Sequence, residues 1–183
     1  DHPLYAQRIR QAARKGAQVN VLVDSAPVWA MPVANVMKAD ASVWSAALAG
    51  VAAAVAQAKG VASPVDAQVT DAARAVAESL MSGDNKAVLL GNAAAHHPQA
   101  SSLLALAQWI AERTGARWGY LTEAANTVVA QLVQALPGAG GLNATQILSG
   151  AAKAVLLLNA EVGLDTAVCG KGLAQAQMVV SLS

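Results

Sequence analysis

Lys86–Gln99 reads KAVLLGNAAAHHPQ, and this stretch decides the fold that the sequence predicts. An apolar strand over Ala87–Leu90 runs into Gly91, a loop of small residues, and a proline that opens the next helix. The same order recurs at Lys153–Asp165, KAVLLLNAEVGLD, and more faintly at Gln18–Asp24, QVNVLVD. Parallel sheets of α/β proteins present such strand ends at their carboxyl edge, where their ligands bind.

The apolar runs along the chain predict an α/β fold. They are apolar throughout rather than alternating, which is typical of parallel strands that helices cover on both faces. We therefore expect one three-layer α/β/α domain over residues 1–183, Rossmann-like, with a mainly parallel sheet of about five strands. The expected strands are 19–23, 87–90, 118–121, 154–158 and 178–182, and the expected helices are 3–15, 41–59, 63–80, 98–114, 123–136, 143–148 and 166–174.

Cap signals and breakers set the expected helix boundaries. Ser63-Pro64-Val65-Asp66 is similar to a capping box, so a helix should begin at Ser63. Thr122 should cap the helix EAANTVVAQLVQAL, and Asn143 the short helix after the glycine cluster 138–141. Residues 25–40 contain two prolines, which predict an irregular loop.

Two helices raise specific alternatives. Pro3–Lys15 carries four cations, which form either a solvated face or a grip for a phosphate group. Ala41–Ala58 has no charge over nearly the length of a membrane span. It is dominated by alanine and flanked by Asp40 and Lys59, so we expect a helix packed inside a soluble domain.

Composition excludes several classes of function. Twelve Lys and Arg residues balance eleven Asp and Glu residues, which gives no reason to expect a nucleic acid or an anionic membrane as partner. Cys169 is the single cysteine, so this chain cannot form an internal disulfide or, by itself, an all-cysteine iron–sulfur or zinc site. The chain begins at Asp1 without Met and stops in a strand-like run, and we expect a piece of a longer protein.

The loop after the central strand holds the first candidate site residues. The His96-His97 pair could bind a metal, but transition-metal sites need three or more convergent ligands. Alternatively, the pair packs or caps locally. The loop could also cradle a phosphate, although it has one glycine where the dinucleotide fingerprint needs more. No Walker motif and no GxSxG elbow occur in the chain. The candidates at this loop are Gly91, Asn92, His96 and His97.

The strand end after residue 158 holds the second set of candidates. Asn159, Glu161 and Asp165 could contact a ribose or the amino group of a pterin. They could equally be turn and cap residues, because Asn and Asp cap helices routinely. Cys169 is expected to be a small buried hydrophobe.

Several of these segments resemble a known family. GNAAAHHPQASSLLALAQWIAERTG, GYLTEAANTVVAQ, PGAGGLNA and KAVLLLNAEVGLD resemble the molybdopterin-oxidoreductase-like region of the large iron–sulfur subunit of bacterial NADH–quinone oxidoreductase (respiratory complex I). The opening HPLYAQRIRQAARKGAQVNVLVD also resembles that region, and the resemblance covers essentially the whole chain.

The resemblance implies a three-layer fold like that of formate dehydrogenase and DMSO reductase, in an architectural rather than catalytic role. It implies no catalytic residue, no metal and no cofactor in this chain, with iron–sulfur clusters in the rest of the parent subunit. Gly91, Asn92, His96, His97, Asn159, Glu161 and Asp165 would then line a relic cleft.

The implied partners are the rest of the large iron–sulfur subunit and other peripheral-arm subunits of complex I, on the cytoplasmic side of the bacterial inner membrane and without membrane insertion. Two departures fit a degenerate site. Val162 follows Glu161 where the family commonly has Pro, and Val128 and Val129 bring bulk where relatives have small residues.

Overall fold

The chain forms two compact units, which are described separately below. The structure is a computed structural model that describes residues 2–25, 28–121, 123, 127–166 and 170–182. Unit 1 is Asp1–Ala125 and unit 2 is Asn126–Ser183. The single domain expected over residues 1–183 stays a prediction.

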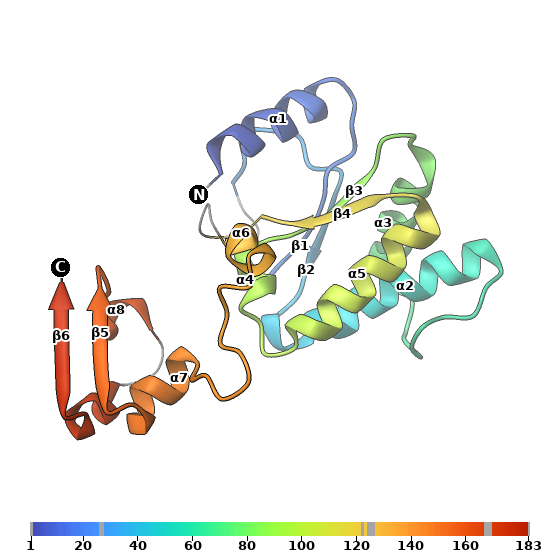
Figure 1. The fold of residues 1–183 in the computed structure, drawn as a ribbon. Coiled ribbons are helices and arrows are strands. Elements are labelled where there is room, and N and C mark those ends of the chain that lie inside the picture. Colours follow the sequence, from blue (N-terminus) through green and yellow to red (C-terminus); the bar gives the residue numbers. More distant parts are fainter. Residues whose placement is uncertain (1, 26–27, 122, 124–126, 167–169, 183) are drawn as a thin grey trace. The chain divides into compact units, whose positions relative to one another are not determined.

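Unit 1 contains two pairs of parallel strands with helices packed against them (Figure 1). In the first pair, Leu22 lies opposite Met37, and in the second, Leu90 lies opposite Tyr120. The elements are α1 (Pro3–Arg14), β1 (Asn20–Val23), β2 (Asn35–Lys38), η1 (Ala41–Val43), α2 (Trp44–Lys59), α3 (Asp71–Ser82), β3 (Ala87–Leu90), α4 (Asn92–Ala95), α5 (Ala100–Thr114) and β4 (Arg117–Tyr120).

Helix α2 is the centre of the unit 1 core. Both α3 and α5 pack against it, and Leu22, Met37 and Val88 reach the same core from three strands. Its side chains are small, so neighbouring backbones approach closely: a Cβ added to Gly50 would lie 2.8 Å from the carbonyl oxygen of Gln68. Val55 and Ala52 have no exposed surface. The alanine-rich sequence therefore gives close packing between layers.

The same helix explains the apolar stretch in the sequence. Ala41–Lys59 is long and apolar enough to cross a membrane by length and composition alone, a test that the core helix of a soluble protein also passes. Half of its apolar window is buried inside the chain. This burial is what we expected of a helix that packs within a domain.

Unit 2 is smaller and is built around one parallel pair. Strand β5 pairs with β6 in register from Ala154 opposite Met178 to Leu158 opposite Leu182. The segment η3, which comes between β5 and β6 in the sequence, packs closely on η2. A Cβ on Gly172 would collide with the backbone at Ser149 and Gly150. The elements are α6 (Thr127–Leu132), α7 (Ala144–Gln146), η2 (Ile147–Ala151), β5 (Ala154–Leu158), α8 (Val162–Asp165), η3 (Gly170–Gln175) and β6 (Met178–Leu182).

The structure confirms the mixed α/β class with parallel strands, but its described residues form three separate two-stranded sheets rather than one sheet of five. It also corrects the predicted loop over 25–40. Strand β2 lies inside that loop, because the apolar residues Val36 and Met37 pair with β1.

Three predicted helices have other bounds. Glu123 lies in a bend and α6 ends at Leu132, so the helix expected over 123–136 is shorter. The helix expected from Ser63 begins at Asp71, with Thr70 as its N-cap. Instead of capping a helix, the Ser63 hydroxyl donates to the carbonyl of Val65 two residues on. Thr166 is extended rather than helical, and the described part of the last predicted helix is a 3₁₀ turn, Gly170–Gln175. Asn143, by contrast, is confirmed as a cap in a reciprocal capping box with Gln146. Thr122 and Cys169 lie outside the described residues.

The corrected start of α3 yields a stability test. The Thr70 hydroxyl accepts a hydrogen bond from the N–H of Ala73 at 3.1 Å. Thr70→Ala should lower the free energy of unfolding by about 1 kcal/mol, because the first turn of α3 loses its side-chain acceptor. Urea denaturation followed by circular dichroism measures this change. Thr70→Ser keeps the oxygen, so its free energy of unfolding should stay close to that of wild type. Ser63→Ala removes no helix cap, so it should lower the free energy of unfolding less than Thr70→Ala does. Equal effects at both positions would contradict this boundary.

Candidate functional site at the strand ends

The predicted loop after β3 forms one short turn of helix at the carboxyl end of that strand. Gly91 precedes α4, and its carbonyl accepts hydrogen bonds from the N–H groups of Ala94 and Ala95, both at 3.0 Å. The chain therefore turns back over the strand end through small residues. This arrangement brings His96 and His97 to the surface of unit 1 beside segments that are distant in sequence.

His97 is held by three contacts with its surroundings. Its ring stacks on the buried indole of Trp44, with centroids 5.9 Å apart and planes inclined by 22°. Nε2 lies 2.8 Å from the carbonyl oxygen of Ala41, and Nδ1 lies 2.9 Å from the backbone nitrogen of Gln99. The carbonyl can only accept, so Nε2 carries the proton and Nδ1 accepts from Gln99. Both ring nitrogens of this neutral imidazole are thus used within the protein.

Trp44 is fixed in turn by its own hydrogen bond. Its Nε1–H donates to the carbonyl of Ala39 at 3.0 Å. Trp44 and Leu103 belong to the cluster that also buries Leu90 at the end of β3. His97 therefore fastens the loop after β3 to the start of α2, which is the local packing role weighed against metal binding.

His96 has a different environment. Its Nε2 lies 3.2 Å from Oε2 of Glu123, and the two side chains are 71% and 70% exposed. A contact this exposed contributes little to stability, because water surrounds both side chains. It joins the loop after β3 to the segment after β4.

Asp40 caps the 3₁₀ turn that precedes α2. Its Oδ1 accepts from the Ser42 hydroxyl at 2.6 Å and from the Ser42 backbone N–H at 2.9 Å. These two bonds, the hydroxyl first, hold the pKa of the Asp40 carboxyl below its usual value of 3.8. The carboxylate is committed to this local turn.

The second predicted set lies in unit 2, after β5. Asn159 adopts a left-handed φ of 48°, which Asn tolerates, while its N–H extends the ladder to the carbonyl of Leu182 at 2.7 Å. Asp165 Oδ2 accepts from the N–H of Glu161 at 2.7 Å. Asp165 and Glu161 thus form a turn, as the capping alternative expects. Ligand binding by either predicted set stays a prediction.

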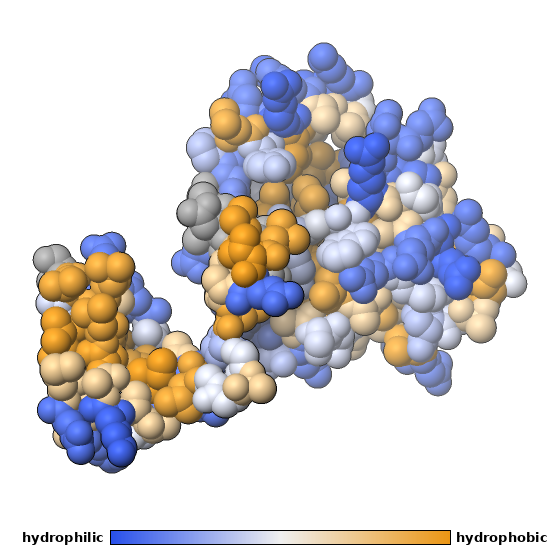
Figure 2. Space-filling model, in the orientation of Figure 1, coloured by the Kyte–Doolittle hydropathy of each residue, from blue (hydrophilic) through white to orange (hydrophobic). Residues whose placement is uncertain are grey.

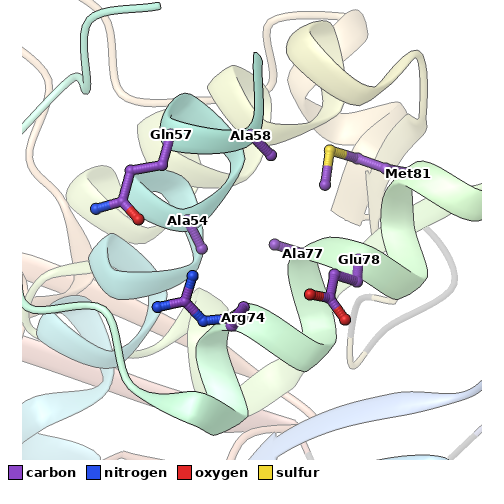
Figure 3. Close-up of a pocket in the computed structure, with 7 residues that line it drawn as sticks. All are labelled: Ala54, Gln57, Ala58, Arg74, Ala77, Glu78 and Met81. Atoms are coloured by element: carbon purple, nitrogen blue, oxygen red, sulfur yellow. The ribbon is translucent and has the colours of Figure 1, made fainter. Parts of the chain in front are cut away.

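A small cleft that the sequence did not predict lies between α2 and α3 (Figure 3). Its volume is about 220 Å³, below the 300–1,000 Å³ or so that is typical of drug-sized ligand sites. The polar residues Gln57, Arg74 and Glu78 are exposed around it. The cleft is lined by Ala54, Gln57, Ala58, Arg74, Ala77, Glu78 and Met81.

The described residues contain no cluster of three or more His, Cys, Asp or Glu side chains that could hold a metal ion. His96 is near one carboxylate, Glu123, and His97 faces a carbonyl and an indole. Sequence reasoning missed these partners, which are 27 to 56 residues away, because no local pattern links them. Comparisons with known proteins add no assignment: no family model, no curated protein and no solved structure matches this chain.

The contacts of His97 yield a second prediction. His97→Ala should lower the free energy of unfolding by about 1–3 kcal/mol, because two hydrogen bonds and the stack on Trp44 are lost. His96→Ala should cost about 0–1 kcal/mol, because its ion pair is exposed. Chemical denaturation of both variants gives the comparison. If the two variants lost the same stability, His97 would not be the residue that fastens this loop.

Asp40 yields a prediction about pH. A carboxyl group whose pKa is lowered on folding stabilises the protein above its unfolded value, and this contribution disappears as the pH falls through the lower folded value. The advantage of wild type over Asp40→Asn should therefore be present well above pH 3.8 and shrink below it. Melting temperatures of both proteins from neutral to acidic pH test this. A difference between the two melting temperatures that stays constant over this pH range would contradict this role of Asp40.

Proposed function

We propose that this chain is a non-catalytic structural domain of the large iron–sulfur subunit of a bacterial NADH–quinone oxidoreductase, whose parent complex transfers electrons from NADH to quinone. The segments GNAAAHHPQ, PGAGGLNA and KAVLLLNAEVGLD, in this order, support the assignment through their resemblance to that family. In this proposal the chain itself holds no cofactor, and the iron–sulfur clusters belong to the rest of the parent subunit.

The observation that carries the architectural role is an open apolar face on the sheet of unit 2. Alternate residues of paired strands share one face. The face that contains Leu156 and Val180 has only apolar residues from β5 and β6. Figure 2 shows hydrophobic residues gathered over these two strands. The large side chains of the face, called here the β5–β6 face, are Leu156 (64% exposed), Leu158 (71%), Met178 (57%), Val180 (39%) and Leu182 (54%).

Such a face is costly to leave in water. Burying a Leu, Val or Met side chain completely is worth about 1.5–3 kcal/mol, and contiguous exposed apolar patches mark sites of association. A two-stranded parallel sheet also has two free edges, whereas parallel sheets normally occur inside larger sheets covered on both faces. The β5–β6 face therefore favours burial against neighbouring protein.

The same reasoning extends to the fold. We infer that the parallel pairs are parts of one mainly parallel sheet of about five strands in a three-layer α/β/α arrangement. All three pairs are parallel, and β3 and β5 are apolar throughout, which supports this arrangement. The neighbours proposed for the assembled domain are the rest of the large iron–sulfur subunit and other peripheral-arm subunits, on the cytoplasmic side of the inner membrane.

A second candidate function is a nucleotide- or pterin-binding domain with a working cleft. The position of Gly91–His97 beyond the carboxyl end of a parallel strand favours it. Against it, both ring nitrogens of His97 and the carboxylate of Asp165 already have partners within the protein. The architectural role is therefore the better supported of the two.

Association with the peripheral arm tests the proposal. Co-expressed with peripheral-arm subunits of a bacterial complex I, the tagged chain should co-purify with them. Leu156→Glu combined with Val180→Glu should abolish this association, because both charges would lie on the β5–β6 face. Circular dichroism should show that the double variant keeps its secondary structure.

Lys171→Glu, placed on η3 rather than on that face, is the control and should still associate. Thermal melting separates the two candidate functions: molybdopterin or NADH should leave the melting temperature unchanged. A rise of several degrees at modest ligand concentration would contradict the architectural role and favour the cleft, because a ligand that binds only the folded state raises its stability.

A further inference from the structure

In unit 1, helices α2, α3 and α5 pack on the same side of both strand pairs, β1–β2 and β3–β4. Leu22, Met37, Val88 and Leu90 point into the clusters on that side. Because side chains alternate along a strand, their neighbours point the other way. This second face, called here the outer face of unit 1, is formed by Val21, Val23, Val36, Lys38, Ala87, Leu89, Arg117 and Gly119.

The outer face is apolar in its middle and largely uncovered. Val36 and Leu89 are 45% and 44% exposed. Gly119 lies opposite Leu89, and a Cβ added to it would meet no atom within 4 Å. Figure 1 shows α1 on this side of the strands, away from α2, α3 and α5. Ala13 is the one buried residue of α1, so this helix does not close the face.

Most charges on or beside the outer face are basic, although the acid Asp24 directly follows Val23 at the end of β1. Half of the twelve basic side chains of the chain lie on α1, on its C-cap or on the outer face: Arg8, Arg10, Arg14, Lys15, Lys38 and Arg117. No acidic residue occurs between Asp1 and Asp24, and none occurs at the outer positions of the strands. The acids of unit 1 instead include Asp66, Asp71, Glu78 and Glu112 on or beside the helices of the covered face.

We propose that the outer face of unit 1 docks an acidic amphipathic α-helix of a partner protein, with apolar residues against Val36 and Leu89 and Asp or Glu residues beside the basic rim. Parallel strands are normally covered by helices on both faces, so a helix is the element that completes this layer. Lys38 and Arg117, which lie at strand positions of the outer face, select acidic residues on that helix by charge complementarity. The inference rests on the proposed function, since it gives the chemistry of one neighbour of the structural domain.

The partner is a protein rather than a lipid surface. The exposed apolar residues of the outer face lie on a sheet with their backbones paired, and they are flanked by α1. A bilayer binds instead an amphipathic helix whose apolar face is free to enter the headgroup region. The net charge of the whole chain is only +1, which gives little attraction to anionic lipid at a distance.

A panel of helical peptides tests the inference on the full chain of 183 residues. The first peptide spans about five turns, with a Leu stripe and Glu on both flanks. A second carries Lys in place of Glu, and a third has the first composition in a scrambled order that breaks the stripe. Fluorescence anisotropy of labelled peptides measures binding. The Leu/Glu peptide should bind at least about tenfold more tightly than either other peptide, and added salt should weaken it.

Variants locate the binding site. Lys38→Glu with Arg117→Glu should weaken the Leu/Glu peptide at least about tenfold and improve the Leu/Lys peptide. Lys59→Glu with Arg74→Glu changes the net charge equally, on the helices of the covered face, and should leave both affinities within about threefold. Gly119→Glu puts a carboxylate into open space on the face, so it should keep the melting temperature yet abolish binding of the Leu/Glu peptide.

Several outcomes would overturn the inference. These are no binding of the Leu/Glu peptide, equal binding of all three peptides, or equal effects of the two charge-reversed pairs. Binding to phosphatidylcholine–phosphatidylserine vesicles without binding to the peptide would assign the face to a membrane instead. If the peptide fails while peripheral-arm subunits still co-purify, the docking inference falls and the proposed function stands. If instead the Leu/Glu peptide binds but molybdopterin or NADH raises the melting temperature, the proposed function falls and the docking inference stands.

Discussion

The close approach of α2 to its neighbours is the constraint on which the structure of unit 1 depends. Val51, Ala52 and Val55 are almost completely buried, and α3 and α5 lie against this helix. With small side chains on α2, the backbone just before α3 comes near enough for a single added methyl at Gly50 to meet the Gln68 carbonyl. Packing contacts that other proteins obtain from aromatic side chains come here from short distances between backbones. This explains how a chain without any Phe builds a core.

One-sided coverage of the strands follows from the same arrangement. Three helices of unit 1 gather on one face of β1–β4, and the opposite face is left with Val36 and Leu89 half exposed. In unit 2, β5 and β6 likewise expose a row of Leu, Met and Val side chains. Both faces expose apolar side chains, so burying them against another protein would add a hydrophobic contribution that the chain's own fold does not supply. That contribution is the physical basis for the architectural role that we propose.

The strand ends show why candidate site residues were found and their partners were not. Gly91–His97 and Asn159–Asp165 follow strands, and strand ends are visible in the sequence as apolar runs closed by Gly or Asn. What those residues contact depends on elements far along the chain. His97 meets Ala41 and Trp44, which belong to the segment before and at the start of α2. No periodicity or motif encodes that meeting, so the sequence left metal binding and local packing as alternatives for the two histidines, and the packing contacts of His97 are visible only in the fold.

The sequence by itself determined the α/β class, the parallel direction of the strands and most element positions, because apolar runs and caps are local signals. Lys86–Gln99 is the clearest example, since its strand and turn lie where the sequence predicts. Tertiary structure decided the outcome where the local sequence signals are weak. Ser63 bonds within its own loop, Thr70 caps α3, and β2 forms by pairing with β1. It also decided which apolar faces stay open and where the cations gather. Those properties arise from how separate elements come together, which the order of residues in any one element does not specify.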